Sequence, residues 1–388
     1  MSHAIRFDTV PLLVDRLIVH QFDAARPSPG GIDSCLRGIC RYAPEGMSIA
    51  IVGVDTGGGP EGRALGRWEK HRFDDREIWF LPVASLDPGN QRRRVPHAAR
   101  LVAGMLRYRR RLPKSIWTQA HRMDTGVAVR LIFRRKFAYF IHTQESGLTG
   151  QTSDSVWRRL GSIHHRLERG NVKHADDVVV FNEEFASSLT AEYPQARFSP
   201  TWYDPAILGS GPREPFSIVW VGRLEVPKDP MLAVETMRQL VELDPRRPWR
   251  LSLLGDGTEM ENLRQLAAKL GESAPFELLG RVAPEDVMDR LSKASLFLMT
   301  SHPGYEGYPR VLVEALASGL PAVVTAGSDT GSLIDDGVNG FVTSRDPKEI
   351  ASRLVRAHDL HSDAARNTAE SLAAPAVIAR IYTSGHVS

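Results

Sequence analysis

The second half of the chain alternates short apolar runs with longer amphipathic segments, and this pattern constrains the fold most strongly. The apolar runs lie at 217–222, 250–255, 276–280, 295–301 and 321–326. They are apolar throughout rather than at every second position, which is typical of strands covered on both faces. The segments between them show helical spacing. We therefore predict β-α repeats that form a parallel, Rossmann-like sheet.

The first half repeats this plan less clearly. Its candidate strands lie at 16–22, 48–54, 77–83, 115–119, 137–143 and 177–182. A stretch rich in Pro, Gly and Ser at 199–216 separates the halves, and 388 residues are enough for two domains. We expect an α/β protein with two Rossmann-like, doubly wound parallel-sheet domains, 1–205 and 206–373, facing across a cleft. The cleft is the expected ligand site, because such sheets bind ligands at the carboxyl ends of their strands.

Composition excludes several classes of protein. With 42% hydrophobic and 24% charged residues, disorder is not indicated. No apolar run is long enough to span a bilayer, and the N-terminus lacks the apolar core of a secretory signal, so we expect a cytoplasmic protein. Cys35 and Cys40 are too few for a disulfide framework or a thiolate metal site, and we interpret both as buried thiols. No D-x-D, H-E-x-x-H or C-x-x-C motif occurs, so we expect no metal and no other cofactor.

Charge divides the chain unevenly. Residues 1–200 contain 30 Lys and Arg against 21 Asp and Glu, whereas the remaining residues contain 19 against 25. Residues 92–136 alone hold fourteen Lys or Arg and one acid, Asp124. This stretch suggests peripheral binding to an anionic membrane surface, with a solvated basic face as the alternative. We predict no nucleic-acid partner, because no aromatic-interleaved stacking motif accompanies the arginines.

Two cations follow the first strand of the second half. In "VGRLEVPKDP", Arg223 and Lys228 lie in the loop after the apolar run 217–222. A guanidinium and an ammonium at a strand's carboxyl end suit a diphosphate. The alternative is a pair of solvated loop cations.

A short helix is predicted within "SHPGYEGYPRVLVEALASG", residues 301–319. Pro309 fits its first position, the helix runs through Leu316, and Gly319 is a plausible stop. The unpaired N–H groups of Arg310 and Val311 at its start could bind an anion.

Two glutamates accompany this helix. Packing does not explain Glu306, which lies in the loop before the helix. Glu314 is the lone acid in an otherwise apolar helix and needs a partner there. Carboxylates accept hydrogen bonds from vicinal hydroxyls, so Glu306 could hold a sugar ring and Glu314 a ribose. An exposed helix position is the alternative for Glu314.

The first half offers weaker candidates. Gly30 and Gly31, before the first predicted helix, would let backbone approach a ligand, and Asp33 or Ser34 could cap that helix. The loop is not a G-x-G-x-x-G fingerprint, which disfavours a dinucleotide cofactor. His142 ends a predicted strand at the cleft edge, although a lone histidine is often structural.

Together these residues resemble the retaining glycosyltransferases of family 4, which have the GT-B architecture and belong to the glycosyl transferases group 1. The likeness is strong over 215–345, through "GRLEVPK", "LLGDGTE", "LLGRV", the pair of glutamates spaced E-x7-E and "LIDDGVNGFV". It is weaker but in register over 16–205, through "PGGIDSCLRG", "FIHT" and "DDVVVFNEEFASSL".

The resemblance implies roles for these residues. Arg223 and Lys228 would bind the donor diphosphate, Glu314 the ribose and Glu306 the transferred sugar. In the first domain, Gly30 and Gly31 would approach the β-phosphate and His142 would lie beside the sugar and acceptor. The loop at Arg281 and Val282 would meet the base, and the helix in 374–388 would cross back onto the first domain.

The implied reaction transfers a hexose from GDP-mannose or a UDP-hexose, with retention of configuration, to a glycan or lipid-linked acceptor in polysaccharide or glycolipid biosynthesis. The alternatives are a non-catalytic GT-B subunit that binds a sugar nucleotide or glycan, and a GT-B phosphorylase or epimerase. Two departures from the family blur donor identity. Tyr308 and Pro309 replace an aromatic-glycine pair, and Ser332 stands where many members carry glutamate.

Overall fold

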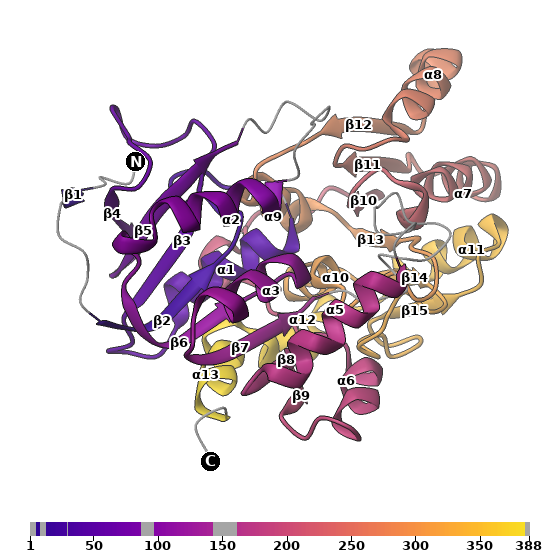
Figure 1. Cartoon of the computed structure of the whole chain (residues 1–388). Coiled ribbons are helices and arrows are strands. Elements are labelled where there is room, and N and C mark those ends of the chain that lie inside the picture. Colours follow the sequence, from indigo (N-terminus) through magenta and orange to yellow (C-terminus); the bar gives the residue numbers. More distant parts are fainter. Residues whose placement is uncertain (1–4, 8–12, 29, 87–96, 143–160, 385–388) are drawn as a thin grey trace. The chain divides into compact units, whose positions relative to one another are not determined.

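The computed structural model describes residues 5–7, 13–28, 30–86, 97–142 and 161–384 (Figure 1). These residues form two compact units. The N-terminal unit comprises the described residues within Met1–His142, Ser162–Ser199 and Ile378–Ser388, and the C-terminal unit takes in Pro200–Val377. Each unit is built around one sheet.

The sheet of the N-terminal unit has nine strands in the order β1-β4-β5-β3-β2-β6-β7-β8-β9. Their bounds are β1 Ile5–Phe7, β2 Leu13–Val19, β3 Ile49–Asp55, β4 Trp68–Phe73, β5 Arg76–Ser85, β6 Lys114–Ala120, β7 Lys136–Ile141, β8 Asp177–Val180 and β9 Ala196–Phe198. From β5 to β9 every neighbouring pair is parallel, whereas β4 is antiparallel to both β1 and β5.

Helices cover both faces of this sheet. They are α1 Gly31–Tyr42, α2 His97–Arg107, α3 Met123–Ile132, α5 Gly161–His174, α6 Glu183–Thr190 and α13 Ala374–Ser384. Leu17 and Val19 of β2 share one core with Leu101 and Met105 of α2. On the other face, Arg16 of β2 contacts the ring of Tyr382 from α13. The alternation of β2 residues between two helix layers explains why every residue from Arg16 to Val19 is buried.

The sheet of the C-terminal unit is wholly parallel, in the order β12-β11-β10-β13-β14-β15. Its strands are β10 Ser217–Val221, β11 Arg250–Leu254, β12 Phe276–Gly280, β13 Leu296–Met299, β14 Ala322–Thr325 and β15 Gly340–Thr343. Numbered within the unit, this is the 3-2-1-4-5-6 order of a doubly wound fold, whose direction of winding reverses between β10 and β13. Ligands of such sheets bind beside the carboxyl ends of these two strands.

The helices of the C-terminal unit are α7 Pro230–Leu243, α8 Met260–Leu270, α9 Pro284–Lys293, α10 Arg310–Ala317, α11 Pro347–Ala357 and α12 Ser362–Ala369. Residues of α7, α8 and α11 pack on Ile218 and Trp220 of β10 in one core. On the other side of the sheet, α9 contacts β10, and α10 contacts β13 and β14. The two Rossmann-like sheets confirm the predicted fold class.

Several local predictions can be compared with the structure. Cys35 and Cys40 are both buried thiols, as predicted. The prediction for Pro309 is wrong, because α10 begins at Arg310 and Pro309 is the residue before it. The prediction that Asp33 or Ser34 caps α1 is also wrong. The capping position is Gly30, and Asp33 lies inside the first turn, where its carboxylate accepts a hydrogen bond from Arg37.

Candidate functional site

The loop after β10 and the start of the loop after β13 are joined by hydrogen bonds. Thr300 follows β13, and its hydroxyl contacts the carbonyl oxygens of Lys228 at 2.9 Å and Asp229 at 2.8 Å. The indole Nε1 of Trp220, in β10, donates to the same hydroxyl at 2.9 Å. The backbone that carries Lys228 is therefore fixed at the point where the winding of the sheet reverses.

Lys228 and Glu306 form an ion pair at this position. The Nζ of Lys228 donates to Glu306 Oε1 at 2.6 Å, and the hydroxyl of Ser301 donates to the same oxygen at 2.6 Å. The two charged side chains are only 14% and 11% exposed. Removal from water strengthens the attraction between them. Two groups that lie 78 residues apart in the sequence are thus paired in a largely buried position.

Arg223 lies in the same loop but is more exposed. Its guanidinium pairs with Glu225 at 2.7 Å and donates to the hydroxyl of Tyr305, and its side chain is 63% exposed. Burial raises the pKa of Tyr305 to about 12, so this phenol is neutral at physiological pH. The ring of Tyr305 also lies 5.8 Å from Lys228 Nζ, within the range of a cation–π contact. Tyr305 therefore contacts both predicted diphosphate-binding cations.

The start of α10 carries the remaining charged candidates. Arg310 Nε donates to Glu314 Oε1 at 2.8 Å, one helical turn later, and both side chains are 15% exposed. Glu314 thus has the partner that its apolar surroundings require. Among the described residues, no side chain caps the N-terminus of α10, where the backbone of Arg310 and Val311 begins the helix. Val282 is half-buried in the loop after β12.

A further ion pair, between Asp229 and Arg345, holds the loop that carries Lys228. Asp229 has a left-handed φ of 48° and caps α7 by accepting from Leu232 N at 3.0 Å. Arg345, which follows β15, pairs with the carboxylate of Asp229 and donates to the carbonyl oxygens of Thr300 at 2.8 Å and Ser301 at 3.0 Å. One guanidinium therefore ties the loops after β10, β13 and β15 together.

In the N-terminal unit, the glycine pair lies between β2 and α1. Gly30 has a φ of 146°, which other residues rarely adopt, and Gly31 is the first residue of α1. A Cβ added at either position would meet no described atom within 4 Å. The local backbone conformation requires glycine at Gly30, and both residues leave the backbone exposed.

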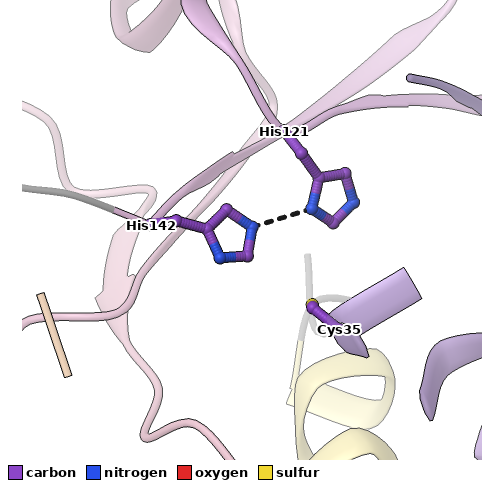
Figure 2. A group of neighbouring side chains, drawn as sticks. All are labelled: Cys35, His121 and His142. Carbon is purple, nitrogen blue, oxygen red and sulfur yellow. Dashed lines mark hydrogen bonds between the residues drawn. The ribbon is translucent and has the colours of Figure 1, made fainter. Parts of the chain in front are cut away.

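His142 lies at the carboxyl end of β7 and is bonded to a second histidine. His142 Nε2 and His121 Nδ1 are 2.8 Å apart, with the rings stacked (Figure 2). His121 follows β6, is 3% exposed and was not singled out from the sequence. Burial lowers the pKa of His121 well below its ordinary value, so its ring is neutral.

Cys35 of α1 lies beside this pair, and the ligand atoms of the three side chains are within 4.8 Å of one another (Figure 2). A thiolate and two imidazoles are a typical zinc-binding set. Two nitrogens on one tetrahedral zinc ion lie about 3.3 Å apart, however, because each is about 2.0 Å from the metal. The 2.8 Å between the two rings is the length of a hydrogen bond instead.

The structure brings some predicted site residues together and leaves others apart. In the C-terminal unit, Lys228 contacts Glu306 directly, whereas Arg310 pairs with Glu314 and Arg223 with Glu225. Sequence reasoning missed Ser301, Tyr305, Arg345 and His121. His121 and Ser301 each follow a strand, so the same strand-end signal that selected His142 could have found them.

Comparison with known proteins connects this geometry to a family. Residues 215–359 match the profile described as "Glycosyl transferases group 1". They contain Lys228, Glu306 and the whole of α10. This match confirms the resemblance to the glycosyl transferases group 1 that was seen in the sequence.

Curated relatives align with part of the chain. WcaL of Escherichia coli (strain K12), provisionally named a colanic acid biosynthesis glycosyltransferase, is 32% identical over 157 residues, covering 39% of this chain and 38% of WcaL. The D-inositol 3-phosphate glycosyltransferase of Nocardia farcinica is 30% identical over 214 residues, covering 50% of this chain and 46% of that protein. The chain thus spans less than half the length of these relatives.

Solved structures show the same fold over nearly the whole chain. Sucrose-phosphate synthase of Thermosynechococcus elongatus has a TM-score of 0.70 at 14% identity, covering 94% of this chain and 96% of that one. HepE of Anabaena, in complex with UDP and glucose, has a TM-score of 0.68 at 17% identity, covering 96% and 99%. The group 1 region is therefore one half of a GT-B fold. None of the described helices is long and apolar enough to cross a bilayer.

Proposed function

We propose that this chain is a glycosyltransferase that moves a hexose from a nucleotide-diphosphate sugar to a glycan or lipid-linked acceptor. The observation that carries the proposal is the Lys228–Glu306 pair beside the carboxyl ends of β10 and β13. An ammonium and a carboxylate held side by side can meet the two parts of such a donor. The cation meets the diphosphate, and the carboxylate accepts hydrogen bonds from sugar hydroxyls.

The residues around this pair suit the rest of the donor. The uncapped start of α10 offers N–H groups to phosphate, and Arg223 adds a second cation. Glu314, one turn into α10, is assigned to the ribose, and Val282 to the base. In the N-terminal unit we assign Gly30 and Gly31 to backbone contacts with the donor, and His142 to the transferred sugar or acceptor.

The proposed chemistry retains the anomeric configuration by a front-face route. The bond between the sugar C1 and the diphosphate oxygen breaks, and the acceptor oxygen bonds to C1 on the same face. The acceptor's proton passes to the departing phosphate. Lys228 and Arg223 stabilise the negative charge that develops on the leaving group, with no metal ion needed. Removing one such donor typically costs about 3 to 4 kcal/mol of transition-state stabilisation.

Relatives support the choice of substrates. WcaL is named for colanic acid biosynthesis, the Nocardia protein for transfer to D-inositol 3-phosphate, and HepE was crystallised with UDP and glucose. We therefore propose a GDP-mannose or UDP-hexose donor and a role in polysaccharide or glycolipid biosynthesis.

A lipid-linked acceptor would agree with the basic surface of the N-terminal unit. In the described part of 92–136, Arg107, Arg109, Arg110 and Arg111 are all exposed, next to Leu106, which is 53% exposed. Clustered cations near a membrane contribute about 1 kcal/mol each toward anionic lipid. We propose that this surface holds the protein at the cytoplasmic face of a membrane. Co-sedimentation with liposomes that is independent of anionic lipid content would contradict this.

The proposal is tested in two steps. Thermal shift with GDP-mannose, UDP-glucose, UDP-galactose and UDP-GlcNAc should single out one donor, because a ligand at a hundredfold excess over Kd stabilises by about 2.7 kcal/mol. Incubating that donor with candidate acceptors, and following the product by NMR, should then show transfer with retention. Glu306→Gln should abolish transfer. Donor binding without turnover with any acceptor would indicate a non-catalytic subunit. Conversion of the donor to its epimer without an acceptor would indicate an epimerase, and release of free sugar would indicate hydrolysis.

A further inference from the structure

A chain of buried side chains leads from α13 to His142 in the N-terminal unit. The hydroxyl of Tyr382 donates to Gln119 Oε1 at 3.2 Å, and Gln119 Nε2 lies 2.7 Å from His121 Nε2. His121 Nδ1 lies 2.8 Å from His142 Nε2. Tyr382, Gln119 and His121 are at most 3% exposed, so water has little access to these contacts.

The direction of each hydrogen bond follows from the chemistry of its partners. An amide nitrogen only donates, so Nε2 of Gln119 requires an unprotonated Nε2 on His121. A neutral imidazole carries one proton, which in His121 must then lie on Nδ1. That N–H donates to Nε2 of His142, which therefore accepts (Figure 2). In its neutral form His142 is left with its proton on Nδ1.

We propose that Gln119 and His121 fix the tautomer of His142, so that a substrate oxygen at Nδ1 meets a hydrogen-bond donor. His142 then steadies an oxygen of the sugar or acceptor and does not remove a proton. Gln119 and His121 are positioning residues that act through His142. The inference deepens the proposed function and rests on it for the identity of the substrate, but the tautomer itself follows from the hydrogen bonds alone.

The surroundings of these hydrogen-bonded side chains favour their uncharged forms. Burial lowers the pKa of His121 well below its ordinary value, and burial lowers that of the neighbouring His20 to about 3. The rings of His20 and His121 are 6.1 Å apart, so a proton on either one would repel a proton on the other. A neutral His121 carries a single ring proton, so the hydrogen bond from Gln119 decides whether its Nδ1 donates to His142 or accepts from it.

Gln119→Glu reverses this pattern with little change in shape. A carboxylate accepts, so His121 Nε2 must donate to it. If His121 stays neutral, its Nδ1 becomes an acceptor and His142 Nε2 must carry the proton. The matched control is Gln195→Glu, because the Gln195 amide bonds only the carbonyl oxygens of Val172 and Ala175 in the described contacts.

The measurement is long-range proton–nitrogen NMR of ¹⁵N-histidine-labelled protein, with signals assigned through His121→Gln and His142→Gln. In wild type and in Gln195→Glu we expect the Nδ1–H form of both rings. In Gln119→Glu we expect His142 to change to the Nε2–H form, or to show a protonated His121. Should Gln119→Glu not fold, Tyr382→Phe frees the Gln119 amide to turn, and His142 should then show both forms. An Nε2–H form of His142 in the wild type would overturn the inference.

A kinetic comparison separates this inference from the proposed function. Changing His142 from donor to acceptor should lower kcat by about a hundredfold, the usual cost of a lost oriented donor, with nucleotide affinity within about twofold. If both histidines show the predicted tautomers but the protein transfers no sugar, only the proposed function is contradicted. Transfer by a wild-type protein with the opposite tautomer would contradict the inference alone, as would full activity in a Gln119→Glu variant whose His142 tautomer has reversed.

Discussion

The candidate residues are charged and ion-paired in the C-terminal unit, whereas in the N-terminal unit they lie beside uncharged, hydrogen-bonded groups. In the C-terminal unit, Lys228, Arg310 and Arg223 are each paired with a glutamate. In the N-terminal unit, His142 ends a chain of neutral, hydrogen-bonded groups. Under the proposed function, the C-terminal unit would neutralise the charged diphosphate, and the N-terminal unit would orient an uncharged sugar or acceptor.

Net charge alone would have placed the diphosphate site in the first half of the chain. Residues 1–200 carry the excess of cations, yet the proposed diphosphate site lies in the half with 19 Lys and Arg against 25 Asp and Glu. An anion responds to the few charges it contacts and to the amides aimed at it, more than to the sum over a domain. The basic excess of the first half is available for a surface instead, as at Arg109, Arg110 and Arg111.

The largest effect is expected where the charged site is broken. Lys228→Ala should lower turnover by about a hundredfold to a thousandfold, because the variant loses a cation aimed at the leaving group. Lys293→Ala is the control, since Lys293 is a half-buried partner of Asp289 at 2.7 Å outside the proposed site, and the change should leave turnover as it is. Steady-state kinetics with the identified donor measures both. Comparable losses in both variants would point to a general effect on stability.

The neutral region should be sensitive to acid. Burial lowers the folded-state pKa of His20 to about 3, while its unfolded value is about 6.5. As pH falls below about 6.5 the unfolded chain binds a proton that the folded protein does not, so stability falls until about pH 3. Between pH 7 and pH 5 His20 alone should cost about 2 kcal/mol. Urea unfolding at both pH values should show a smaller loss in His20→Gln, and an equal loss would contradict this.

Arg223 sharpens the comparison within the charged unit. Its side chain is 63% exposed and forms an ion pair with Glu225. Solvent therefore screens the charge of Arg223 more than that of Lys228. Arg223→Ala should therefore lower turnover by only about tenfold. The ratio of kcat values for the two variants measures the difference. A loss at Arg223 as large as that at Lys228 would show that exposure does not rank the two cations.

The smallest effect is expected at Glu314. Glu314→Gln keeps an acceptor for ribose but loses the charge, so nucleotide binding should weaken by about fivefold. Nucleoside monophosphates and diphosphates should be affected alike, because the ribose is common to both. Calorimetric titration with each nucleotide tests this, and a loss confined to the diphosphate would move Glu314 from the ribose to the phosphates.

The elements that were predicted best from the sequence are the buried strands. Strands such as β10 and β13 are covered on both faces and read as continuous apolar runs. In contrast, β4 was missed, because "WEKHRF" has four consecutive polar residues between its two aromatic ends and pairs antiparallel. Strand ends located Lys228 and Glu306 correctly at one edge of a sheet. Their direct pairing, and the support from Thr300 and Arg345, depend on loop conformations that no local pattern encodes.

The histidine pair shows the same limit. His142 was selected because it ends a predicted strand, and His121 directly follows the neighbouring strand β6, but neither position indicates that the two rings touch. That contact depends on the parallel register of β6 and β7. The start of α10 was misplaced by one residue, at Pro309, because proline is acceptable both at and just before a first helical position.

The central claim is that Lys228 and the start of α10 hold a diphosphate in the C-terminal unit. Isothermal titration of UDP against UMP, and of GDP against GMP, tests it most directly in wild type and Lys228→Ala. For the recognised base, the wild type should bind the diphosphate about tenfold or more tightly than the monophosphate, and Lys228→Ala should bind the two about equally. Equal binding by the wild type, or an undiminished preference in Lys228→Ala, would contradict the account.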